Sequence, residues 1–129
     1  MKVGIISKDI GNLLFNIRPI KFGGAEVQQK LLAEGLIKKG HNINFLTNYV
    51  SPEINKNNSN FNFFRFNSKS FGGSNFNIIY DFFSLFNAML RSNSDIFIIK
   101  LPRLLLSQVC LISKILDKKI VFWLCHDRD

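Results

Sequence analysis

A glycine pair stands directly before a helical pattern near the start of the chain, within Gly23-Gly24-Ala25-Glu26. Glycine lets the backbone approach a ligand closely, and the free amides of a first helical turn, here those of Gly24 to Glu26, carry partial positive charge. These properties suit a diphosphate group. The spacing matches neither GxGxxG nor GxxxxGK[ST], so a simple loop-to-helix turn is the competing interpretation.

A second group of residues that could take part in catalysis is the polar run His126-Asp127-Arg128-Asp129, which follows an apolar stretch. A histidine titrates near neutral pH and can donate one hydrogen bond while it accepts another. The carboxylate of Asp127 stands next to it and can orient the ring or act separately. We therefore interpret His126 and Asp127 as candidate catalytic residues, against the alternative of an ordinary polar loop.

Two cations flank a proline after another apolar run, in Lys100-Leu101-Pro102-Arg103. Lysine offers a point charge and arginine a bidentate fork, so Lys100 and Arg103 are candidates for holding a phosphate or an acceptor. The competing interpretation is a solvated helix start. His41 occupies a helix-to-strand turn, where we expect a capping role.

The elements that must position these residues follow from the hydrophobic pattern. Strands are expected over residues 2–7, 42–47, 60–66, 95–100 and 119–124, and helices over about 25–39, 76–90 and 103–116. Short apolar strands that alternate with helices predict an α/β fold, a Rossmann-like parallel sheet of about five strands with helices on both faces. Ligands bind such sheets beyond the carboxyl ends of the strands, where strand order reverses. This rule selects the loops 8–24, 101–103 and 125–129.

The same pattern predicts which side chains form the core. The helix at 103–116 is apolar almost all round, so we expect it to be buried. We expect seven apolar side chains of the strands and helices to be buried: Val3, Ile5, Leu31, Ile98, Val109, Ile112 and Val121.

Composition sets limits on the class of protein. The 129 residues are 47% hydrophobic, enough for one core, and neither repeats nor a linker divide residues 1–129 into two domains. The net charge of +8 favours anionic partners, but the cations are scattered, which argues against nucleic-acid binding. Cys110 and Cys125 form no metal or disulfide spacing, and no signal or membrane-spanning pattern is present. We therefore expect a cytoplasmic protein that needs no metal or other cofactor.

Several segments together resemble the opening of family 4 glycosyltransferases. They are MKVGIIS at residues 1–7, GGAEVQQ at 23–29, LAEGL at 32–36, KGH at 39–41, DIFIIK at 95–100 and IVFWLCHD at 120–127. The resemblance implies the acceptor-side, N-terminal domain of a two-domain GT-B enzyme. Such enzymes transfer a hexose or similar sugar from a nucleotide-sugar donor with retention and without an obligatory metal.

The resemblance also implies roles for particular residues. Gly23, Gly24 and the first turn through Glu26 would bind the donor diphosphate. His126 would approach the donor sugar, and Asp127 is carried over with it. Lys100 stands where many relatives have His or Arg, so the acceptor contacts expected there differ from the family pattern.

The donor-binding C-terminal domain of the family has no counterpart within residues 1–129. We therefore expect an incomplete N-terminal domain whose independent turnover is low, and which needs the missing domain or a split subunit as a partner. By analogy its acceptor would be a carbohydrate or a lipid-linked molecule, in surface polysaccharide or glycolipid biosynthesis. A peripheral membrane contact is left open. The alternative function is a non-catalytic partner subunit, or remnant, that binds a separate donor-domain chain.

Overall fold

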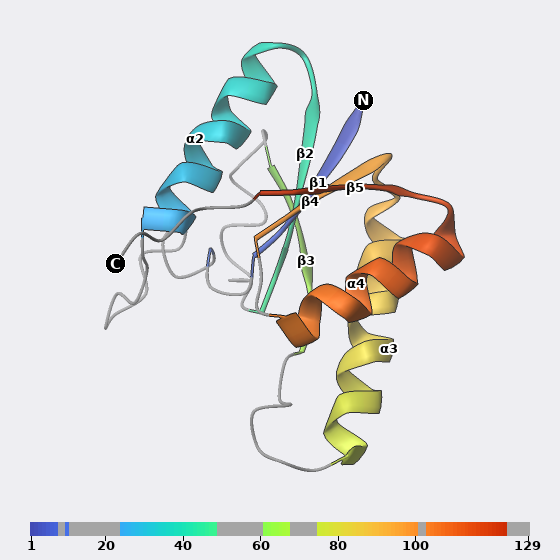
Figure 1. Ribbon diagram of the computed structural model, residues 1–129. Coiled ribbons are helices and arrows are strands. Elements are labelled where there is room, and N and C mark those ends of the chain that lie inside the picture. Colours follow the sequence, from blue (N-terminus) through green and yellow to red (C-terminus); the bar gives the residue numbers. More distant parts are fainter. Residues whose placement is uncertain (8–9, 11–23, 49–60, 68–74, 101–102, 124–129) are drawn as a thin grey trace.

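The computed structural model describes residues 1–7, 10, 24–48, 61–67, 75–100 and 103–123, which form one sheet with helices packed against it (Figure 1). In chain order the elements are β1 (Lys2–Ile6), α2 (Gly24–Lys38), β2 (Asn42–Thr47), β3 (Phe61–Arg65), α3 (Asn75–Ser92), β4 (Ile96–Ile99), α4 (Arg103–Leu116) and β5 (Lys119–Phe122). Each of these elements lies where the hydrophobic pattern predicts it, with ends that differ by at most two residues.

The sheet has five parallel strands in the order β3-β2-β1-β4-β5. The central strand β1 pairs with β2 on one side and with β4 on the other, so Ile6 lies between Leu46 and Ile99. The chain therefore builds outward from β1 in one direction through β2 and β3, and in the other through β4 and β5. This is the expected α/β, Rossmann-like fold.

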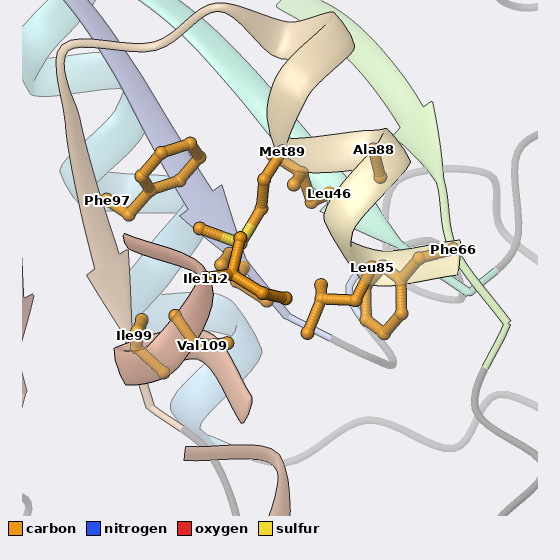
Figure 2. Close-up of a cluster of buried hydrophobic side chains, with 10 residues drawn as sticks. Leu46, Phe66, Leu85, Ala88, Met89, Phe97, Ile99, Val109 and Ile112 are labelled. Atoms are coloured by element: carbon orange, nitrogen blue, oxygen red, sulfur yellow. The ribbon is translucent and has the colours of Figure 1, made fainter. Parts of the chain in front are cut away.

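Helices cover both faces of the sheet (Figure 1). One face carries what we call the α3/α4-side cluster, in which Leu85 and Met89 of α3 and Val109 and Ile112 of α4 pack over the strands (Figure 2). The opposite face carries the α2-side cluster, in which Ala33, Leu36 and Ile37 of α2 pack against β1, β2 and β3. Alternation along β1, β2, β3 and β4 feeds both clusters, because successive side chains point to opposite faces.

The alternating Asn and Phe residues of β3 illustrate this division. Phe61 and Phe63 lie in the α2-side cluster, where the Phe63 ring stacks against Phe45 with centroids 5.8 Å apart. Phe64 packs against the other cluster, and Asn62 is exposed. The strand is half-exposed, as its sequence predicts.

The turn after α2 shows how local sequence ends a helix. The amide of Gly40 donates to Ile37 O at 2.8 Å, and the amide of His41 donates to Leu36 O at 3.1 Å. This hydrogen-bond pattern is a Schellman motif, and Gly40 has the positive φ of 85° that the motif requires. The backbone of His41 thus has the capping role expected for this position.

One close approach inside the sheet also depends on a glycine. A Cβ built on Gly4 would lie 2.5 Å from Cδ1 of Phe97 and 3.0 Å from the Ser94 hydroxyl. Gly4 and Phe97 are direct partners in the β1–β4 pairing, and the Phe97 ring is fully buried. The Phe97 ring fills the space that a side chain on Gly4 would need.

The expected burial of Leu31 is wrong, since 61% of this residue is exposed. The side of α2 that faces the sheet is defined by Gln29 and Ala33, which are buried, together with Leu36 and Ile37. At 3.6 residues per turn, Leu31 lies about 200° round the helix from Ala33 and so points away from the sheet.

The expected burial of Val121 is also wrong, because 43% of this residue is exposed. Ile98, for which the pattern also predicts burial, is only half-buried. Both residues belong to the α2 side of the sheet, where the described helix packs over β2 and not over β5. The expectation that α4 is buried all round is also wrong: Val109 and Ile112 are buried, but Leu111 and Ile115 face solvent. The expected burial of Val3, Ile5, Val109 and Ile112 is confirmed.

Candidate functional site

The strand order places a topological switch point between β1 and β4. The chain leaves β1 toward α2 on one face of the sheet, and it leaves β4 toward α4 on the opposite face. Connections that diverge in this way open a crevice at the carboxyl ends of the two strands. The arrangement selects this edge of the sheet for a ligand, as the sequence predicts.

The beginning of α2 lies at this carboxyl edge. Its last turn is at the opposite edge, because the chain goes directly on to Asn42, whose amide donates to Met1 O at the start of β1. A helix of 15 residues is about 22 Å long, so it spans the strands and returns its first turn to their carboxyl ends (Figure 1). Gly24 is exposed there as the first helical residue, and Glu26 is half-buried in the first turn.

The space beside Gly24 is open. A Cβ built on this glycine meets no atom within 4 Å. Within the described part of the chain there is therefore no packing reason for a glycine at this position.

Two other predicted site residues also lie along this edge. Lys100 directly follows β4 and is half-buried, and Arg103 is the first residue of α4. The end of β5 stays paired with β4, since the amide of Trp123 donates to Ile99 O at 3.0 Å. The strand ends that lead to residues 101 and 124 are thus adjacent.

Gly23, His126 and Asp127 lie outside the described residues. That these three residues share one crevice with Gly24 and Lys100 stays a prediction from the order of the strands. Their roles as donor-binding and catalytic groups stay predictions too.

The opposite, amino-terminal edge of the sheet holds a polar cavity that the sequence analysis missed. Its volume is about 600 Å³, and two cations and several amide side chains line it. The signal in the sequence is Asn44 in the middle of a buried strand, since asparagine is depleted in strands. Nothing local shows that Lys2, Asn62 and Arg91 converge on the same place.

Two further findings concern the described part of the chain. No helix there is both long and apolar enough to cross a membrane. The residues described there also contain no group of three or more His, Cys, Asp or Glu side chains that could hold a metal ion.

Comparison with known proteins identifies a structural neighbour but no sequence family. No protein-family model matches the chain, and no curated protein is detectably similar to it. The crystal structure of MurG from Acinetobacter baumannii matches with a TM-score of 0.62 and 14% sequence identity. The match covers 94% of this chain and 34% of the MurG chain, so the chain spans about a third of that protein.

At this identity the likeness shows the fold. The chain is a Rossmann-like α/β protein whose sheet and helices correspond to about a third of the MurG structure.

Proposed function

We propose that the chain is the N-terminal, acceptor-side part of a GT-B glycosyltransferase. It contributes to the transfer of a sugar from a nucleotide-sugar donor to a carbohydrate or lipid-linked acceptor. The observation that carries the proposal is the match to MurG over 94% of this chain. We propose further that the enzyme belongs to family 4, whose motifs this sequence resembles, and that it transfers the sugar with retention of configuration. Its product would serve surface polysaccharide or glycolipid assembly.

The chemistry at the carboxyl edge supports a nucleoside diphosphate as the leaving group. The free amides at the start of α2 carry partial positive charge next to an exposed glycine with open space beside it. Fixed donors of this kind stabilise negative charge as it develops on a departing diphosphate. Lys100 at the end of β4 adds a cation at the same edge. His126 and Asp127 are proposed to act on the reacting sugar.

Turnover is proposed to require a donor-binding domain in addition to residues 1–129. The first experiment therefore measures release of nucleoside diphosphate from a panel of nucleotide sugars. It compares the chain alone with the chain supplied with the polypeptide that carries the donor domain, sought in the same or the adjacent reading frame. Sugar-dependent release only in the combined sample supports the proposal. Absence of release and of donor binding in that sample contradicts it.

In the combined enzyme, Gly24→Val is expected to raise the donor KM about tenfold or more, with a smaller effect on kcat. The reason is steric, because the new side chain occupies space that is open in the protein and is assigned to the diphosphate. Gly35→Val is the matched control, since it lies in the same helix and also has nothing within 4 Å of its built Cβ. Equal effects of the two substitutions on the donor KM would remove Gly24 from the donor site.

His126→Ala is expected to lower kcat about tenfold or more while the donor KM changes little, because this residue is assigned to the reacting sugar. The control is His41→Ala, which removes an imidazole at the far end of α2 and keeps the backbone cap. Unchanged kcat for His126→Ala would exclude the residue from catalysis.

The alternative, a non-catalytic subunit that binds a separate donor-domain chain, draws on the apolar side chains exposed on α4 and β5. Leu111, Ile115, Val121 and Phe122 are all exposed. The same kinetic experiment separates the two functions. A partner subunit would raise the stability of the donor-domain chain, but His126→Ala would leave turnover unchanged.

A further inference from the structure

The polar cavity at the amino-terminal edge of the sheet is formed by residues far apart in the sequence. Lys2 begins β1, Asn42 begins β2, Asn62 lies in β3, and Arg91 and Asn93 come from the end of α3 and the residue after it. The cavity lies on the α3 side of the sheet, at the edge opposite to the one where Gly24 begins α2. Its volume of about 600 Å³ is in the range of small-molecule sites.

A hydrogen-bonded network fixes the floor of this cavity. The Asn44 amide is buried and donates to Ser92 O and to the Ser94 hydroxyl, both at 2.9 Å. Its Oδ1 accepts a hydrogen bond of 3.1 Å from the Asn62 side chain. Asn62 is therefore held in place, and as a primary amide it keeps a further N–H and its own oxygen to offer.

The network also satisfies carbonyl groups at the C-terminal end of α3, which carries partial negative charge. Ser92 O accepts from Asn44, and Met89 O accepts from the Ser92 hydroxyl. Leu90 O accepts from the amide of Asn93, whose φ of 45° turns the chain there. Three helix carbonyls that would otherwise repel an anion thus already have donors.

The charge that remains in the cavity is positive. Lys2 and Arg91 are exposed, and within the described part of the chain neither makes an ion pair. The nearby Asp95 carboxylate accepts the backbone amide of Lys2 at 2.8 Å and is not among the residues that line the cavity. A guanidinium with a bidentate fork, an ammonium and amide donors are the groups that bind a phosphoryl oxyanion.

We infer that this cavity binds the phosphoryl group of a phosphorylated, hydroxyl-bearing small molecule. Arg91 and Lys2 hold the phosphoryl oxygens, Asn62 and Asn93 bind hydroxyl groups, and the half-buried Phe64 forms an apolar wall. The site is separate from the proposed sugar-transfer site and does not depend on it. The phosphoryl group can belong to a free metabolite or to a lipid headgroup.

The test is a titration of the full chain with glucose 1-phosphate, inorganic phosphate and glucose, followed by calorimetry and by the side-chain amide NMR signals of Asn62 and Asn93. We expect the two phosphates to bind and to shift both signals, and glucose to bind much more weakly. The double variant Lys2→Gln/Arg91→Gln is expected to weaken phosphate binding at least about tenfold. Lys39→Gln/Arg65→Gln removes the same charge from exposed sites outside the cavity and is expected to leave binding within about twofold.

Asn93 offers a second, independent variant that keeps the fold. Asn93→Asp retains a residue that tolerates the positive φ and adds a carboxylate beside the phosphate, so binding should weaken strongly. Asn93→Gly keeps the backbone conformation without the charge, and its effect should be much smaller. Equal loss in both would remove the electrostatic part of the inference.

A lipid source is tested in parallel with sedimentation on vesicles of phosphatidylglycerol and, as the neutral reference, phosphatidylcholine. Binding to phosphatidylglycerol alone that the Lys2→Gln/Arg91→Gln variant abolishes would assign the same site to a lipid phosphoryl group. Equal weakening in the Lys39→Gln/Arg65→Gln control would show nonspecific attraction to a basic protein and overturn the inference. It is also overturned if neither phosphates nor vesicles shift the Asn62 and Asn93 signals, or if glucose binds as tightly as glucose 1-phosphate.

Discussion

The two faces of the sheet are covered unequally. On the α3/α4 side, two helices pack over the strands and bury Phe97, Ile99 and Met89 almost completely. On the α2 side, one described helix packs over β2, so Ile98 is half-buried and Val121 is exposed. The difference shows that apolar sequence alone does not make a core residue, because burial also needs an element on the opposite side.

The unequal cover also links the fold to the proposed function. Leu111 and Ile115 are exposed on α4, and Val121 and Phe122 are exposed on the edge strand β5. Contiguous exposed apolar surface marks contact with a partner or a tendency to aggregate. If the proposed function is correct, we expect the chain alone to be poorly soluble and a donor-side polypeptide that covers these residues to improve its solubility.

Two adjacent isoleucines of β4 face opposite sides of the sheet, and their substitution should change the free energy of unfolding by very different amounts. Ile99→Ala removes a side chain buried in the α3/α4-side cluster and should lower the free energy of unfolding by about 2–5 kcal/mol. Ile98→Ala, on the half-covered side, should cost less than half as much. Urea denaturation of both variants measures the difference. Equal losses would show that the two faces are covered alike.

Removal of the Asn44 side chain, which lies in the polar network on the α3/α4 side of the sheet, should lower the free energy of unfolding by less than Ile99→Ala does. Asn44→Ala leaves Ser92 O and the Ser94 hydroxyl without their shared donor in a buried position. The expected loss in the free energy of unfolding is about 1–3 kcal/mol. Asn42→Ala is the control, because Asn42 lies two residues earlier on the same side of the strand and is exposed. A loss for Asn42→Ala as large as that for Asn44→Ala would contradict a special role of the network.

Of the three substitutions, one in the edge strand β5 should change the free energy of unfolding least. Val121→Ala in the chain alone should change the free energy of unfolding by no more than about 0.5 kcal/mol, because much of this side chain already contacts water. In the presence of a covering donor-side polypeptide the cost should rise. Thermal unfolding of the chain with and without that polypeptide measures both values. A large loss in the chain alone would mean that Val121 is part of the core.

The positions of the helices and strands could be predicted from local sequence patterns. Apolar strands that alternate with helical patterns predicted every described element, and Gly40 predicted the end of α2. The rule for parallel sheets also predicted the switch point between β1 and β4. These features depend on local periodicity and on backbone conformations that particular residues favour, so neighbouring residues are enough to predict them.

In contrast, the burial of individual apolar residues and the convergence of polar groups could not be predicted from local patterns. Leu31 and Val121 fit their local patterns, yet their exposure depends on which side of α2 meets the sheet and on what covers β5. The amino-edge cavity joins Lys2, Asn62 and Arg91 from β1, β3 and α3, and no spacing in the sequence encodes that meeting. Burial and convergence are properties of contacts between distant segments, and such contacts exist only once the strands and helices have packed.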